Sequence, residues 1–239
     1  MSATLAASSG SAYWYLTRST GAVALVLLTM TVVLGVLDVR RFSTRGWPRF
    51  VLDALHRNLA LLTIVFLALH ILTSVLDSFA PISLSAAVVP FISPYRPFWL
   101  GLGAIAFDLL LAITITSLLR RAIGHAAWRA AHWLSYLSWP LALLHGFGTG
   151  SDVKSTWLLM LSIACLIAVL AAVLVRSLAG WPSNARARIG VIGVACTFTL
   201  ALLLWLPSGP LGSGWAQRAG TPTNLLAHSA HPSTGGEQR

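Results

Sequence analysis

Two pairs of histidines in two apolar segments are the residues of this chain best placed to do chemistry. His56 and His70 are fourteen positions apart in one segment, and His132 and His145 are thirteen positions apart in another. An odd number of crossings separates the two segments, so we expect them to run in the same direction through a membrane. At about 1.5 Å per helical residue, each presents one imidazole near its start and one about 20 Å further along. The four side chains therefore form two pairs at matched depths.

A pair of imidazoles at one depth suits a flat metal-bearing ring better than a bare metal ion. Imidazole binds haem iron, zinc and copper, but a closed zinc site usually needs four ligands that converge on one point. The histidines of each segment lie too far apart to converge, whereas a macrocycle supplies the other four bonds itself. Because no Cys-x-x-Cys-His sequence is present, covalent haem attachment is excluded. The pattern predicts two stacked bis-His b-type haems, an arrangement with no open iron position that favours electron transfer.

A simpler interpretation of each histidine is a hydrogen bond to a neighbouring helix. Polar side chains are unfavourable at membrane depth, however, and four of them at paired depths favour a functional role. His125 has no depth-matched partner and is interpreted as an interfacial residue, while His228 and His231 lie in a polar tail.

The angle about the helix axis between the two histidines of each segment tests whether both rings lie on one face of the helix. Fourteen positions leave His70 about 40° from the face of His56, but thirteen positions leave His145 about 140° from His132 on an ideal helix. Pro140 lies between the second pair. It removes a backbone hydrogen bond, so we expect a kink there that brings both rings to one face.

The composition is that of an all-α membrane protein. Charged residues make up 9% of the 239-residue chain and hydrophobic residues 56%, and the mean hydropathy is +0.79. A soluble domain carries about 25% charged residues. Apolar runs of about 20 residues are long enough to cross the bilayer, and they predict a bundle of six transmembrane helices over residues 13–206. The expected spans are residues 16–37, 51–76, 98–119, 126–145, 156–178 and 189–206. Residues 1–12 are predicted to be disordered, and the Gly-, Ser-, Thr- and Pro-rich residues 207–239 are predicted to form a flexible extracytoplasmic tail.

The net charge of +10 marks topology rather than nucleic-acid binding. Of the 16 Lys and Arg residues, 11 flank the first, third and fifth loops. An excess of basic residues marks the cytoplasmic face, so both termini are expected outside. The 11 basic residues are Arg40, Arg41, Arg45, Arg49, Arg57, Arg120, Arg121, Arg129, Arg176, Arg186 and Arg188.

Several short motifs accompany the two histidine pairs. They are Thr17-Arg18-Ser19-Thr20-Gly21, Pro94-Tyr95-Arg96-Pro97 with Gly101, Ser117-Leu118-Leu119-Arg120-Arg121 and Trp128-Arg129-Ala130-Ala131-His132. On these residues the chain resembles, over residues 13–178, the ferric reductase-like transmembrane domain family. This group includes ferric reductases, NADPH oxidases and the haem subunit of a bacterial methionine-sulfoxide reductase system. By similarity, His56 and His132 would ligate a cytoplasmic-side haem, and His70 and His145 an outer one, in a bacterial inner membrane.

The chain departs from the larger members of that family because it shows no nucleotide-binding sequence. There is no Gly-x-Gly-x-x-Gly before a helix and no P-loop, so we expect neither a flavin nor an NAD(P) site. The expected function is that of a membrane cytochrome b subunit of a reductase system. Electrons would come from quinol or a cytoplasmic flavin reductase and leave to an extracytoplasmic flavoprotein or another acceptor. Two alternatives stay open: a self-sufficient ferric or quinone reductase, and a non-redox structural or transport protein that binds no haem.

Four arginines are candidates for binding haem propionates. Arg57 and Arg129 lie close in sequence to the ligands expected on the cytoplasmic side, and Arg18 and Arg96 lie near the expected outer face. Arginine pairs well with carboxylates. Contact with membrane lipid headgroups is the equally simple alternative for each of them.

Overall fold

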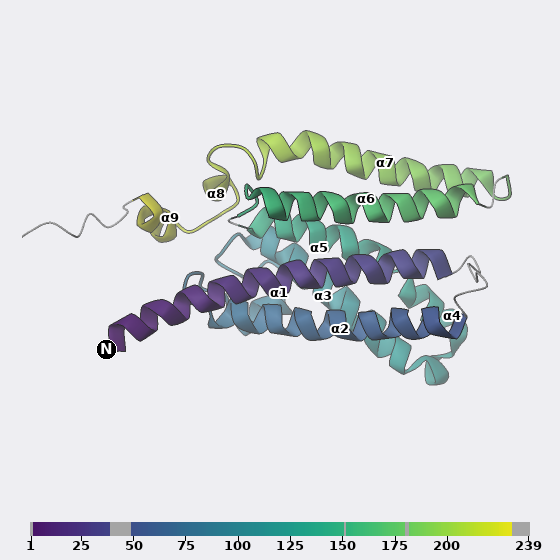
Figure 1. The fold of residues 1–239 in the computed structure, drawn as a ribbon, viewed down its shortest axis with the longest axis horizontal. Coiled ribbons are helices and arrows are strands. Elements are labelled where there is room, and N and C mark those ends of the chain that lie inside the picture. The colour runs from purple at the N-terminus through teal and green to yellow at the C-terminus, as the bar shows by residue number, and fades with distance from the viewer. Residues whose placement is uncertain (1, 39–48, 151, 180–181, 231–239) are drawn as a thin grey trace, which may run out of the picture.

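The computed structural model describes residues 2–38, 49–150, 152–179 and 182–230, and within these ranges the chain is helical with no β-strand (Figure 1). Arg40, Arg41, Arg45, His231 and Arg239 lie outside the described residues. The all-α prediction is confirmed for the part of the chain that the structure describes.

Five helices of the described ranges are long and apolar enough to cross a membrane. Each is a nearly continuous run of Leu, Val, Ile and Ala, with many of these side chains facing outward, as expected of surfaces that meet lipid. The chain is therefore a multi-pass membrane protein. The five helices are α1 (Ser2–Asp38), α2 (Arg49–Leu76), α3 (Pro97–Leu118), α6 (Thr156–Leu178) and α7 (Ala185–Ser208).

The span predicted at 126–145 is not one continuous helix. It is divided between α4 (Arg120–His132) and α5 (Ser135–Thr149), with a turn at residues 133–134. Around the turn, the N–H groups of Leu134, Tyr136 and Leu137 bond to carbonyls three residues earlier, which is the 3₁₀ pattern. The 15 residues of α5 extend only about 22 Å, less than the hydrocarbon thickness of about 30 Å.

Helix α5 runs through Pro140, and the break in the predicted span lies at residues 133–134. A 3₁₀ turn advances about 120° per residue, against about 100° in an α-helix. The tightened stretch therefore adds rotation in the direction needed to close the gap of about 140° that an ideal helix leaves between His132 and His145.

Helix α5 is the centre of the bundle. Trp139, Leu143 and Phe147 are buried and pack in one core cluster with residues of α1, α6 and α7. The indole Nε1–H of Trp139 donates to Thr29 Oγ1 of α1 at 2.9 Å, which satisfies the polar atom of this buried ring.

The beginning of α1 lies at the same end of the bundle as α8 (Trp215–Arg218) and α9 (Thr223–Ala230), and α4 lies at the opposite end (Figure 1). We call these the α8 end and the α4 end. A loop with a short 3₁₀ helix, η1 (Leu84–Ala87), joins α2 to α3 at the α8 end.

Helices also occupy residues 2–12 and part of residues 207–230. Residues 2–12 continue α1, because a run rich in Ala and Ser extends the helix of the apolar span at little further entropic cost. Helix α7 continues to Ser208, and Trp215 of α8 packs on Trp99 and Trp205 with ring centroids 5.3 and 5.6 Å away. Aromatic packing thus holds α8 against the bundle.

Candidate functional site

The structure brings the four histidines together in the two pairs that the sequence predicted. The ring centroids of His56 and His132 are 6.3 Å apart, and those of His70 and His145 are also 6.3 Å apart. Helix α2 supplies one ring to each pair, α4 ends at His132, and α5 carries His145. His56 and His132 form the α4-end pair, and His70 and His145 form the α8-end pair, about 21 Å away along α2.

The spacing within each pair fits one metal atom between two imidazoles. A metal–nitrogen bond is about 2 Å, and the nitrogen lies about 1.2 Å from the ring centre, so a metal held between two imidazoles would separate their centroids by about 6.4 Å. Within the described ranges, no three His, Cys, Asp or Glu side chains converge as a closed metal site would require. A group that brings its own in-plane ligands therefore fits these pairs better than a bare ion.

A backbone carbonyl of α1 anchors each histidine of α2. His70 Nδ1 bonds to the Thr17 carbonyl oxygen at 2.8 Å, and His56 Nδ1 bonds to the Thr31 carbonyl oxygen at 3.1 Å. With the Nδ1–H donating to a carbonyl, the lone pair of the other ring nitrogen is free for a metal.

A glycine lies four residues after each of these carbonyls and gives the imidazole access to it. A Cβ atom on Gly21 would lie 2.9 Å from the His70 ring, and one on Gly35 would lie 3.2 Å from the His56 ring. In a helix the side chain at position i+4 stands beside the carbonyl of residue i. Its absence lets a second donor reach that carbonyl, which already accepts the helical bond.

Helix α3 repeats the arrangement for the third histidine. His145 Nδ1 bonds to the Trp99 carbonyl oxygen at 3.0 Å, and a Cβ on Gly103, four residues later, would overlap the His145 ring. The same pairing of a carbonyl with a glycine therefore holds three of the four imidazoles.

Sequence reasoning missed Thr31, Gly35, Trp99 and Gly103, although a signal for the first two was present. Thr17 and Gly21 recur as Thr31 and Gly35 at the same interval that separates the two histidines of α2. Because α1 and α2 are antiparallel and share this interval, each histidine of α2 meets a carbonyl and a glycine of α1 at its own depth. Gly101 has a different role, since it lies against Phe91 in the loop before α3.

The fourth histidine has different surroundings. His132 Nδ1 is buried and has no hydrogen-bond partner among the described residues. Its ring instead lies against Trp128, with centroids 5.1 Å apart. His125 is exposed on α4, in keeping with the interfacial role expected of it.

A cavity of about 290 Å³ surrounds the α8-end pair and is lined by His70 and His145. Most of its walls are apolar side chains of α1, α2, α3 and α5, and Arg18, Asp77 and Tyr95 add polar groups. Such a space, apolar with a few convergent polar groups, is typical of a cofactor site.

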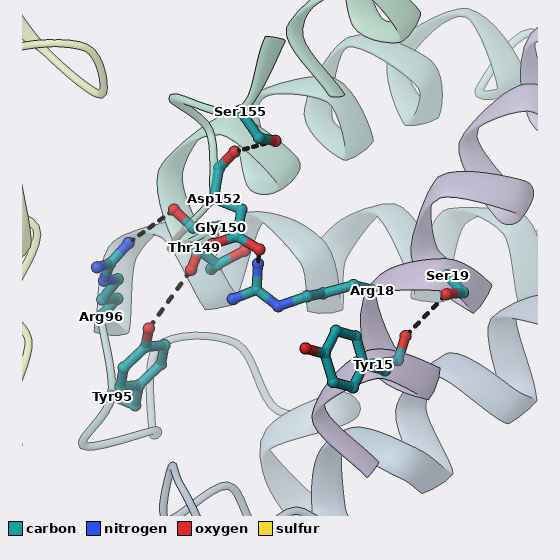
Figure 2. Close-up of polar contacts among 9 residues, drawn as sticks. All are labelled: Tyr15, Arg18, Ser19, Tyr95, Arg96, Thr149, Gly150, Asp152 and Ser155. Carbon is teal, nitrogen blue, oxygen red and sulfur yellow. Dashed lines mark hydrogen bonds and ion pairs between the residues drawn. The ribbon is translucent and has the colours of Figure 1, made fainter. Parts of the chain in front are cut away.

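Two of the predicted propionate-binding arginines, Arg18 and Arg96, have separate roles at the α8 end. Arg18 forms an ion pair with Asp152 (Figure 2). It also lines the cavity, and its guanidinium carbon lies 3.6 Å from the centroid of the Trp14 ring. Arg96 does not line the cavity, which differs from the expectation for this residue.

The buried Arg96 guanidinium joins three segments of the chain. It donates to the carbonyl oxygens of Gly148 at 2.9 Å and Gly150 at 3.4 Å, and to Thr221 Oγ1 at 2.9 Å (Figure 2 shows the Gly150 contact). Its backbone N–H donates to the Gly220 carbonyl at 3.0 Å. Burial lowers the pKa of Arg96 and raises that of the adjacent Tyr95 phenol, whose hydroxyl donates to the Thr149 carbonyl at 3.4 Å. Arg96 therefore holds the end of α5 and the C-terminal segment together.

The other two candidates lie toward the α4 end. The side chains of Arg57, next to His56, and Arg129, three residues before His132, are both exposed. The structure leaves both arginines available to lipid headgroups or to an anionic group at the surface.

Comparison with known proteins places the chain in a family. The model described as "Ferric reductase like transmembrane component" matches residues 20–144, more than half of the chain. The chain belongs to this family. It is also 33% identical over 134 residues to the "Protein-methionine-sulfoxide reductase heme-binding subunit MsrQ" of Ralstonia nicotianae. The matched region makes up 55% of this chain and 57% of that protein. The chain thus spans little more than half the length of this relative, and no solved structure matches it. Together with the apolar helices, the family identifies a multi-pass protein of the bacterial inner membrane.

The contact between Gly21 and His70 predicts an asymmetric response to added methyl groups. Gly21→Ala should lower the free energy of unfolding by about 1–3 kcal/mol, because the new Cβ must displace the imidazole. Gly146→Ala is the matched control: it adjoins His145 but a Cβ there meets nothing within 4 Å, so stability should stay the same or rise by up to about 1 kcal/mol. Unfolding in detergent, followed by tryptophan fluorescence, measures both. Equal stabilities would show that the ring does not pack on Gly21.

The contacts of Arg96 predict that it protects the C-terminal segment. Arg96→Ala removes charged hydrogen bonds to the Gly148 and Gly150 carbonyls and to Thr221, so trypsin should cut after Arg218 roughly tenfold faster or more. Mass spectrometry of a timed digest in detergent measures the rate, and Arg57→Ala, an exposed arginine on α2, is the control. An unchanged rate of cleavage at Arg218 would contradict this role.

Proposed function

We propose that this chain carries electrons across the bacterial inner membrane through two b-type haems, one bound by each histidine pair. His56 and His132 bind the haem at the α4 end, and His70 and His145 bind the haem at the α8 end. The single observation that carries the proposal is the 6.3 Å spacing of both ring pairs, which would fit one iron between two imidazoles.

The anchoring carbonyls support this assignment over a purely structural role for the histidines. The Thr17, Thr31 and Trp99 carbonyls take the Nδ1–H of three rings and so direct the remaining nitrogen to a metal. A haem bound there would supply one-electron chemistry at its iron. The two imidazoles of each pair would hold its iron, the carbonyls orient three of the four rings, and the apolar cavity walls exclude water around His70 and His145. The haem-binding description of the Ralstonia relative agrees with this role.

The remaining parts of the site follow from the same proposal. Arg18 is the best placed candidate for a haem propionate, since it lines the cavity beside His70 and can share its charge between that group and Asp152. Arg57 and Arg129 are the candidates for the other haem. A sixth crossing formed by the turn at 133–134 and α5 would put the α4 end in the cytoplasm and both termini outside, and the excess of basic residues at the α4 end supports this orientation.

Electrons enter at the α4 end from membrane quinol or a separate cytoplasmic flavin reductase, because the sequence shows no nucleotide-binding motif. They leave at the α8 end to an extracytoplasmic redox protein. The Ralstonia relative is described as one subunit of a protein-methionine-sulfoxide reductase, which supports a partner protein as the acceptor.

Haem content tests the four ligands directly. The purified chain should contain close to two haems, and His70→Ala or His145→Ala should leave about one, because a haem with a single axial anchor is held less tightly. Haem per polypeptide is measured by the pyridine haemochrome spectrum. His125→Ala changes an exposed histidine of α4 and should retain two. A colourless wild-type chain would refute the proposal.

Vesicles test transfer across the membrane. With the chain reconstituted, ferricyanide inside and dithionite outside, the internal ferricyanide should be reduced, and His70→Ala should lower the rate to that of empty vesicles. Loss of ferricyanide absorbance measures the rate, with His125→Ala as the active control. External NADPH alone should reduce nothing, and reduction by NADPH without a partner would contradict the assigned donors.

A further inference from the structure

The surroundings of His132 differ from those of the other three histidines. In α1, a carbonyl and its glycine occur twice, since Thr31 and Gly35 follow Thr17 and Gly21 at an interval of fourteen positions. The same step in α3, taken from Trp99 and Gly103, leads to Ile113 and Ser117.

Both of these positions are used by other groups. The Ile113 carbonyl accepts a hydrogen bond from Thr116 Oγ1 at 3.1 Å. Ser117 has a side chain at the position where the other three histidines meet a glycine, and its Oγ accepts a hydrogen bond from Trp128 Nε1 at 3.2 Å. In the described part of the chain, His132 Nδ1 bonds to no carbonyl of α3, and Ser117 stands where the other three histidines meet a glycine.

Trp128 is the group that holds His132 instead. The two rings lie with centroids 5.1 Å apart and planes inclined by 34°, one helical turn apart on α4. Ring packing restrains rotation of an imidazole less sharply than a linear N–H to carbonyl bond does. His132 Nδ1 has no hydrogen-bond partner in the described part of the chain.

The backbone that carries His132 is also less constrained than that of the other three histidines. Helix α4 has no buried residue, and Gly124 within it has φ of +80°. His132 is its last residue, directly before the turn at 133–134, whereas His56, His70 and His145 lie inside long or central helices.

We propose that His132 is an exchangeable iron ligand, so that the α4-end site accepts a small neutral ligand such as carbon monoxide, and that Trp128 is the positioning residue that limits this exchange. The inference rests on the proposed function, since it requires haem between His56 and His132. The two haem sites then differ chemically. At the α8 end, hydrogen bonds to the Thr17 and Trp99 carbonyls fix both imidazoles, whereas at the α4 end His132 can leave the iron.

Carbon monoxide added to the dithionite-reduced holoprotein in detergent tests the inference. In the wild type, the visible spectrum should show conversion of no more than one haem per chain. Trp128→Ala should convert that one haem roughly five- to tenfold faster, because ring packing and the anchor to Ser117 are both lost. Ser117→Ala, which removes only the acceptor of the Trp128 bond, should act in the same direction to a smaller extent.

Trp133→Ala is the matched control, since Trp133 is 63% exposed and packs on Tyr136 rather than on His132. It should react like the wild type. Unchanged kinetics in Trp128→Ala with two haems bound would overturn the inference, as would a faster reaction of both haems. If Trp128→Ala fails to hold haem, unchanged kinetics in Ser117→Ala would overturn it. A wild-type chain without haem would refute the proposed function, which the haem assay detects separately.

Discussion

The arrangement of this protein depends on a hydrogen bond from an imidazole to a backbone carbonyl on a neighbouring helix. Inside a membrane, water is not available to satisfy the second nitrogen of a histidine ring, so the protein must supply an acceptor. Helical carbonyls are already bonded within their own helix, and a side chain four residues later normally covers them. Glycine at that position opens the carbonyl, so that the helix backbone itself serves as the acceptor for a buried ring.

This requirement couples the spacing of one helix to that of the next. Helices α1 and α2 are antiparallel, and the interval between the histidines of α2 equals the interval between their carbonyl partners in α1. That interval of fourteen positions is close to four whole turns, so both contacts fall on one face of each helix. On the other side of the site, the interval between the histidines is one position shorter. A straight helix cannot place both of those rings on one face, and the 3₁₀ turns between α4 and α5 add rotation in the direction that closes the gap.

The two ends of the bundle differ in how tightly they pack. At the α8 end, Arg96 bonds to Thr221, and the rings of Trp99, Trp205 and Trp215 pack on one another, which holds residues 215–221 against the bundle. The α4 end is more open, because α4 has no buried residue and its basic side chains are exposed. The pair of His70 and His145 therefore lies toward the more tightly packed end.

The sequence by itself determined the membrane class, most of the helices and the membership of each histidine pair, because apolar length and helical periodicity act within single segments. It also held the Thr17–Gly21 and Thr31–Gly35 repeat. Only the tertiary structure decided which carbonyl each ring meets, since that depends on how two helices are placed against each other. The same reason applies to the direction of the Arg96 guanidinium. The sequence allowed it to face the cavity, whereas the packing of the helices places it against Gly148 and Thr221. This reason also explains the break before α5, where 3₁₀ hydrogen bonds add rotation between His132 and His145.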